Sequence, residues 1–392
     1  MSNISFRLSN AVLEWARTSI GYTIEEAAKK AGVTSEKFIA WEKGEKIPTY
    51  KQLEGLAENV YKRPLALLLL QTPPKEDTIQ KDFRSLSNIE VDNLSVDLRI
   101  ALRKAKRYQH ILEEVITDNE LGKFSKFSVS IKDDPISASL RFRNFLNFSI
   151  EEQKAWSPDK AFNNFKNKIE SLNVYIFQLK MPIHDARAFC LTGKYPLIVL
   201  NTDDSTNGRI FSLFHELCHI FFNTNSIFRD ASTGELKKEY IDIEKFCNQF
   251  AASFLVPDTY FDKDISYMSV TNGREWDEYS ISKLAKEYNV SNEVIARKLL
   301  MKRLIKEDFF WYKKRLWDAY AKSAKESQKE KLKEQALKGI AQDIKIIHEK
   351  GKPYVLGVVS AYQQGKISSS DLSNYLEAKL NHLPKIIERL SN

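Results

Sequence analysis

The chain has 392 residues, of which 43% are hydrophobic and 29% charged, and its formal net charge is +8. This length is too great for one compact core and predicts two to four domains. No apolar run reaches the roughly 18 residues that cross a bilayer, the N-terminus lacks a secretory signal, and three cysteines are too few for a disulfide framework. The composition therefore predicts a cytoplasmic protein with no membrane partner.

The first 72 residues predict a separate all-helical domain. Thr23–Ala31 and Ser35–Lys43 have the caps and apolar spacing of short helices, and Gly32 provides the turn between them. Two short helices joined at a glycine are typical of a helix-turn-helix. Residues 49–61 predict a further helix, and residues 63–70 start the last one.

Two motifs in this domain, Ala28-x-x-x-Gly32-Val33 and Trp41-Glu42-x-Gly44-x-x-x-Pro48-Thr49, resemble those of the XRE, or Cro/C1-type, repressor domains. The resemblance implies a five-helix domain whose second motif helix lies in the major groove. That helix would present the candidate DNA-binding residues Ser35, Glu36, Lys37, Ile39, Ala40 and Lys43. Residues 1–70 carry only ten basic against eight acidic residues, which is a small excess of positive charge for binding the phosphates of DNA. Operator DNA and a protein partner, such as a related repressor, therefore both remain open.

Residues 73–138 are predicted to connect this domain to the next. Pro73 and Pro74 end the preceding helix and begin a polar linker. Residues 93–118 have apolar residues at helical steps and predict an amphipathic helix, whereas residues 119–138 are polar and predict a loop.

The next segment predicts helices at 139–148 and 161–172, strands at 174–177, 187–191 and 195–201, and then an apolar helix that carries the pattern HExxH. Residues four apart share one helix face, so His215 and His219 can bind one metal ion while Glu216 accepts a proton from a water molecule. This pattern is typical of zinc-dependent hydrolysis.

A second apolar helix, ended by Pro257, offers Glu244 as a third metal ligand. A catalytic zinc ion usually has three protein ligands and keeps one position for water, so His215, His219 and Glu244 fill the set. Asn248 lies one turn beyond Glu244 and is a candidate to orient a ligand or to bond to the neighbouring backbone.

Cys218 and Cys247 lie on or beside the proposed metal helices. They are interpreted as small buried apolar residues, with thiolate ligation or a redox switch as the alternative. His110, His348 and His382 are expected at the surface, whereas His184, between two predicted strands, is interpreted as structural, with a place at the border of the cleft as the alternative.

Residues of about 140 to 305 resemble the ImmA/IrrE metallopeptidases through three linked motifs: Pro196–Asn201, Arg209–His219 and Glu244-x-x-Cys-Asn248-x-Phe250-Ala251-Ala252-x-x-Leu255-x-Pro257. The resemblance implies metal ligands at His215, His219 and Glu244. It also implies an intracellular zinc-type peptidase that cleaves a repressor of the helix-turn-helix class. A second helix-turn-helix pattern at 280–299, with Asn289 in its turn, is interpreted as a packing module.

The last segment, 305–392, is predicted to be helical. Residues 301–392 carry 19 basic and 11 acidic residues, and their excess equals the net charge of the whole chain. The sequence thus predicts a multidomain α+β protein: a helix-turn-helix domain (1–72), a linker with an amphipathic helix (73–138), a zincin-like peptidase core with a small sheet (139–304) and a helical C-terminal extension (305–392).

The predicted function is that of a zinc-dependent endopeptidase that regulates transcription, in the manner of a stress response, by cleaving a repressor-type protein. The expected cofactor is Zn²⁺. The expected partners are the protein substrate and operator DNA, and a homodimer is a further expectation. The alternative is a DNA-binding regulator or antitoxin-like protein whose metal site is not catalytic.

Overall fold

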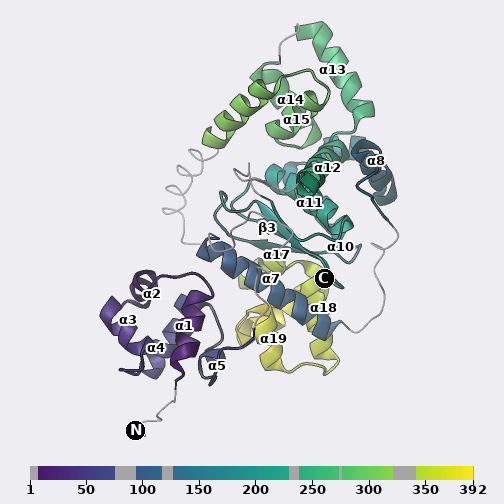
Figure 1. The fold of residues 1–392 in the computed structure, drawn as a ribbon. Helices are drawn as coiled ribbons and strands as arrows, with labels where there is room; N and C mark the ends of the chain where they lie inside the picture. The colour runs from purple at the N-terminus through teal and green to yellow at the C-terminus, as the bar shows by residue number, and fades with distance from the viewer. Residues whose placement is uncertain are drawn as a thin grey trace. The chain divides into compact units, whose positions relative to one another are not determined.

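The structure, a computed structural model, describes residues 8–75, 94–116, 127–228, 238–272, 276–320 and 341–391. The chain divides into two compact units, residues 1–104 and 105–392 (Figure 1). The first unit is helical, and the second combines helices with a four-stranded mixed sheet. The predicted α+β class is confirmed.

The first unit contains the helices α1 (Asn10–Thr18), α2 (Ile24–Ala31), α3 (Ser35–Glu42), α4 (Tyr50–Gly55), the π-helical turn η1 (Leu56–Tyr61), α5 (Leu65–Leu68) and the start of α7 (Val96–Val115). A capping box between Thr23 and Glu26 begins α2. Gly32 ends α2 in the left-handed conformation (φ 65°), which glycine adopts without strain. The predicted helices at Thr23–Ala31 and Ser35–Lys43 are thus present, whereas the predicted helix 49–61 changes from α to π geometry at Leu56.

The second unit begins with the end of α7 and continues through α8 (Pro135–Leu146), α9 (Ile150–Ala155) and α10 (Pro158–Glu170). The predicted loop at 119–138 is wrong at its end, because Asp134 caps α8 and the proline after it takes the first helical position. The strands are β1 (Tyr175–Leu179), β2 (Ala188–Leu191), β3 (Leu197–Asn201) and β4 (Ser226–Phe228), in the order β1-β3-β2-β4. β1 is parallel to β3, whereas β2 is antiparallel to both β3 and β4.

Both faces of this sheet are covered, which explains why β1, β2 and β3 are almost continuously apolar. On one face, Ile176, Cys190 and Ile198 belong to the main core together with residues of α10 and of α11 (Thr206–Phe221). On the other face, Phe177 stacks on Tyr108 of α7 and packs against Tyr354, with ring centroids 4.6 and 5.2 Å apart.

Further helices of the second unit are α12 (Lys238–Leu255), α13 (Asp258–Asn272), α14 (Glu278–Tyr288), α15 (Asn292–Met301), α17 (Gln342–Lys350), α18 (Lys352–Gln363), α19 (Ser369–Leu376), the 3-10 turn η4 (Leu380–His382) and α20 (Leu383–Ser391), and residues 307–320 are also helical. Asn289 ends α14 in the left-handed conformation, which agrees with the turn predicted at this residue. Its side chain donates to the carbonyls of Gln153 and Trp156, each at 2.7 Å, which fixes α14 against α9.

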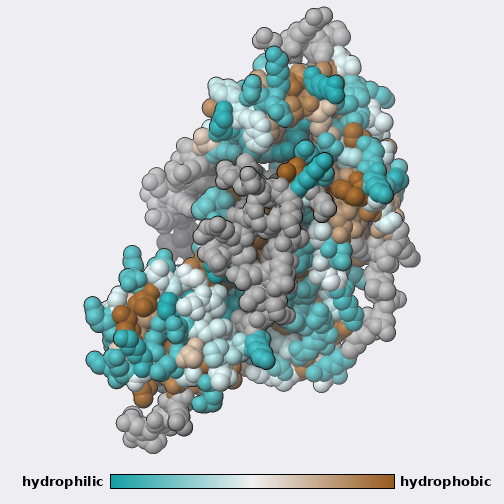
Figure 2. Space-filling view, in the orientation of Figure 1, coloured by the Kyte–Doolittle hydropathy of each residue, from teal (hydrophilic) through white to brown (hydrophobic). Residues whose placement is uncertain are grey.

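Among the described residues, no helix combines the length and the apolar character that crossing a bilayer requires. On the described part of the face in Figure 2, hydrophilic side chains are interspersed with small apolar groups.

Candidate metal centre

Two packed helices, α11 and α12, bring the predicted metal residues together. α11 begins at the N-cap Ser205, whose side chain accepts a hydrogen bond from the Gly208 amide. From Ile210 to Ile220 every side chain of α11 is buried, because the helix lies between the sheet and α12. Phe214 of α11 and Phe254 of α12 stack with ring centroids 4.0 Å apart. This contact fixes the two helices beside each other next to His215.

The side chains of His215, His219 and Glu244 converge on one point. The Nε2 atoms of the two histidines are 3.3 Å apart. One carboxylate oxygen of Glu244 lies 3.3 Å from Nε2 of His215, and the other lies 3.1 Å from Nε2 of His219. Both imidazoles are fully buried, whereas the Glu244 side chain is 21% exposed.

These distances fit a zinc ion. Tetrahedral zinc with bonds of about 2.1 Å to nitrogen and oxygen places its ligand atoms about 3.4 Å from one another. The three observed separations are within a few tenths of an ångström of that value. Two histidines and a carboxylate are also a ligand set that zinc uses in hydrolases. The residues therefore fit a divalent ion at this site.

The charges of these groups are strongly coupled. Burial raises the pKa of Glu244, but the two imidazoles outweigh it and hold that pKa well below its usual value. Burial lowers the pKa of His219, but Cys247 and Glu244 outweigh it and raise that pKa well above its usual value. The site thus favours positive charge between the carboxylate and the imidazoles, which is the charge that a metal ion brings.

Thr224, which follows α11, fixes the ring of His219. Its hydroxyl donates to the carbonyl of His219 at 3.1 Å, so its oxygen is left to accept from Nδ1 of the ring at 3.2 Å. With the Nδ1 proton held in this way, Nε2, which faces Glu244 and His215, is the ring atom available to a metal ion that replaces its proton. This is the tautomer that a metal ligand needs.

Glu216, the predicted general base, follows His215 directly on α11 and is fully buried. Its Oε2 accepts a hydrogen bond from the hydroxyl of Ser226, the first residue of β4. Its Oε1 is buried and has no hydrogen-bond partner in the described part of the chain.

Asn248, the predicted neighbour of the ligands, bonds to backbone rather than to a ligand side chain. Its Nδ2 donates to the carbonyl of Glu244 at 2.9 Å, one turn back along α12. Of the two roles predicted for Asn248, this contact corresponds to the backbone one.

Tyr240 is a site neighbour that the sequence reasoning did not single out. It lies one turn before Glu244 on α12, and its ring is 6.5 Å from that of His219. Burial raises the pKa of its phenol, and the charge of Glu244 and a hydrogen bond to it raise that pKa further. The helical spacing of four residues from Glu244 was the available signal.

The three cysteines are free and buried. Burial and contact with Cys218 raise the pKa of Cys247 well above its usual value, although His219 acts to lower it. All three cysteines belong to the hydrophobic core cluster, which favours the interpretation of Cys218 and Cys247 as small packing residues.

The six candidate DNA-binding residues all lie on or next to α3 in the first unit. Glu36, Lys37 and Lys43 are exposed, and Ser35 and Ile39 are partly exposed. The expectation that Ala40 is exposed was wrong: it is 8% exposed. The Lys46 amide, in the loop after α3, donates to the Ala40 carbonyl at 3.0 Å.

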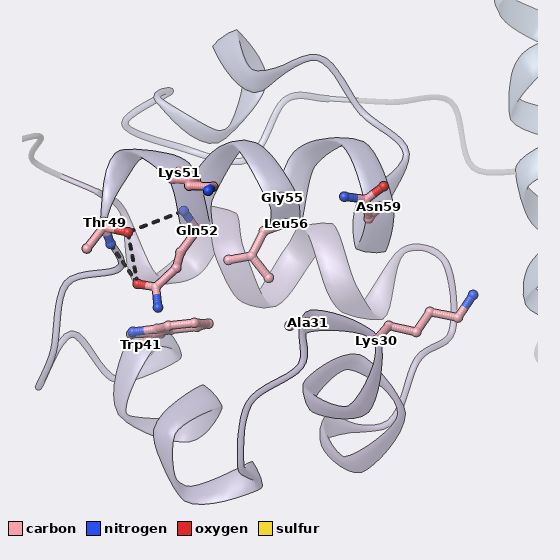
Figure 3. Close-up of a pocket in the computed structure, with 9 residues that line it drawn as sticks. All are labelled: Lys30, Ala31, Trp41, Thr49, Lys51, Gln52, Gly55, Leu56 and Asn59. Atoms are coloured by element: carbon pink, nitrogen blue, oxygen red, sulfur yellow. Dashed lines mark hydrogen bonds between the residues drawn. The ribbon is translucent and has the colours of Figure 1, made fainter.

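The first unit also contains a cleft of about 420 Å³ between α2, α3 and α4 (Figure 3). Trp41 forms one wall, and Lys30 and Lys51 lie at its border. Thr49 and Gln52 line it too, but their side chains are engaged in the capping box of α4. It contains no side chain of the metal group, since His215, His219 and Glu244 belong to the second unit.

Comparison with known proteins bears on part of the chain. No curated protein and no solved structure matches it. The family model described as the IrrE N-terminal-like domain, Peptidase_M78, matches residues 169–300, a range that contains β1 to β4 and the whole metal group. This segment of the chain is therefore similar to a family of peptidases.

Proposed function

We propose that the protein is a zinc-dependent endopeptidase that regulates transcription by cleaving a repressor-type protein. The observation that carries this proposal is the convergence of His215, His219 and Glu244 within 4.8 Å, with Glu216 buried next to His215 in the chain. The match of this segment to a peptidase family supports it.

In this proposal, His215, His219 and Glu244 hold the ion and Glu216 moves the proton. Bound zinc would polarise the scissile carbonyl and lower the pKa of the attacking water. Glu216 then takes a proton from that water at Oε1 and passes it to the nitrogen of the leaving amine. Burial of Glu216 removes competing solvent from this transfer.

The substitution Glu216→Gln tests the proposal, because it keeps the shape of the side chain and removes the base. The variant should still bind zinc but should lose cleavage of a repressor co-expressed from a neighbouring gene, by at least about 100-fold, which is the usual contribution of a general base. Mass spectrometry of the cleaved repressor identifies the bond that is broken.

Two results would contradict the proposal. One is wild-type protein that holds no zinc. The other is a Glu216→Gln variant that acts on the repressor as wild type does. The second result would favour the alternative, a DNA-binding regulator or antitoxin-like protein with a non-catalytic metal site.

We further propose that the first unit binds operator DNA or a helix-turn-helix partner through α3. The succession of α2, the turn at Gly32 and α3 supports this role, as does the exposure of Lys43. Loss of a phosphate-contacting lysine weakens binding and lowers its salt dependence. Lys43→Glu should therefore abolish a gel shift with the protein's own promoter, whereas Lys132→Glu, an exposed site in the second unit, should not.

A further inference from the structure

The chain turns back toward α11 immediately after that helix ends, and this return brings Ser226 to Glu216. Ser226 is the first residue of β4, and its hydroxyl donates to Oε2 of Glu216. Both residues are fully buried. The contact joins a strand at the end of the sheet order to a side chain on the neighbouring helix.

The sheet register directs Ser226 toward α11. Ser226 pairs with Cys190 of β2, and paired residues of adjacent strands point to the same face of a sheet. Cys190 belongs to the core cluster that includes α11, and its Sγ lies 3.4 Å from the Ser226 hydroxyl. The orientation of Ser226 therefore follows from strand pairing.

The residue before Ser226 anchors the turn. Oδ1 of Asn225 accepts hydrogen bonds from the amide and the hydroxyl of Thr192, at 2.7 and 2.9 Å. Thr192 directly follows β2, so the approach of β4 to the site is fixed at a second point.

We propose that Ser226 is a positioning residue for Glu216, an inference that rests on the proposed function. The hydroxyl holds Oε2 and so sets the rotation of the carboxylate. Oε1, buried and without a hydrogen-bond partner in the described part of the chain, is then the oxygen left to accept the proton of the attacking water. A buried carboxylate oxygen without a partner is costly, and such costs recur at functional sites.

A test uses the full chain with Co²⁺ in place of zinc and acetohydroxamic acid as the probe. A hydroxamic acid loses a proton when it binds a metal, so a well-placed carboxylate strengthens its binding. The change in the visible absorption of Co²⁺ on titration gives the dissociation constant, and the metal content of each variant is measured first. The readout is a spectrum, independent of any protein substrate.

The variants are Ser226→Ala, Ser226→Cys and, as the matched control, Ser212→Ala. The cysteine variant nearly keeps the side-chain volume but replaces the hydroxyl with a weak donor. Ser212 is also fully buried on α11, but its hydroxyl has no hydrogen-bond partner in the described part of the chain. Both Ser226 variants should retain Co²⁺ and bind the probe about 10-fold or more weakly, the usual loss when an outer partner of a metal site is removed. The control should bind it as wild type does.

The two proposals fail in different ways. If Glu216→Gln weakens probe binding and the Ser226 variants do not, positioning by Ser226 is overturned and the peptidase proposal stands. If wild type binds no Co²⁺, or if Glu216→Gln binds the probe like wild type, the proposed function itself is overturned. If Ser226→Ala does not fold, the volume-conserving Ser226→Cys decides.

Discussion

At the scale of single residues, the site depends on hydrogen bonds that orient the imidazoles. The Thr224 hydroxyl is held by the carbonyl of His219, so its oxygen accepts from Nδ1 of the same residue. This arrangement fixes both the ring and its tautomer.

Thr224→Val is therefore expected to weaken zinc binding by about 10- to 100-fold, since it keeps the side-chain shape and removes the hydroxyl. Competition with a chromogenic chelator measures the affinity. Thr206→Val is the matched control, because Thr206 lies in the first turn of α11 and its hydroxyl bonds to Arg209 and Asp159. Equal zinc affinity for Thr224→Val and wild type would contradict this role.

At the scale of elements, the metal site depends on the packing of α11 against α12. Phe214 and Phe254 are fully buried and stacked, and Phe254 also contacts Phe142, Phe148 and Phe165. His215 follows Phe214 directly, so the position of the Phe214 ring also sets the position of His215, the first metal ligand.

Phe254→Ala should lower the free energy of unfolding by about 3–5 kcal/mol, the usual cost of truncating a buried phenylalanine. Urea unfolding measures the change. Phe145→Ala makes the same chemical change on α8 at a side chain that is 40% exposed, and it should cost much less. If the two variants lost similar amounts of unfolding free energy, the expectation that Phe254 is packed more tightly than Phe145 would be contradicted.

At the scale of the second unit, the C-terminal helices dock on the edge of the sheet. α17 packs along β1, and Gln178 of β1 donates to the carbonyl of His348 at 2.8 Å. Gly351 ends α17 with φ 77°, and a Cβ there would lie 2.8 Å from the carbonyl oxygen of Ile176. The close approach of these backbones requires glycine at this position.

Gly351→Ala is thus expected to loosen the C-terminal helices from the sheet, seen as faster limited proteolysis and a lower melting temperature. Gly365→Ala is the control, since Gly365 has a similar φ of 72° but open space around it. The Gly365→Ala control should lose only the stability that corresponds to backbone strain, about 1–2 kcal/mol. A Gly351→Ala variant no less stable than Gly365→Ala would contradict the close contact.

Metal removal is also a test at this scale, because a ligand that binds only the folded state stabilises it. Zinc at about 1,000 times its dissociation constant adds about 4 kcal/mol. A chelator should therefore lower the melting temperature of wild type, measured by calorimetry. In His219→Ala, which lacks a ligand, the chelator should have a much smaller effect.

The sequence by itself determined the features that depend on local periodicity. The spacing of His215 and His219 places them on one helix face wherever that helix lies, and the caps Thr23 and Gly32 set helix ends from neighbouring residues alone. The family resemblance supported the choice of Glu244 before any geometry was known. The roles of these residues in catalysis and the division into four domains stay predictions.

Only the tertiary structure decided which residues surround the ligands. Ser226 lies ten residues after Glu216, and no helical or strand period connects the two. Their contact depends on the pairing of β4 with β2, and β4 is too short to give a pattern in the sequence. Likewise Ala40, on the helix expected to face DNA, is 8% exposed, which its position on that helix did not indicate. Local spacing sets which face a side chain occupies, but strand register and helix packing set what that face meets.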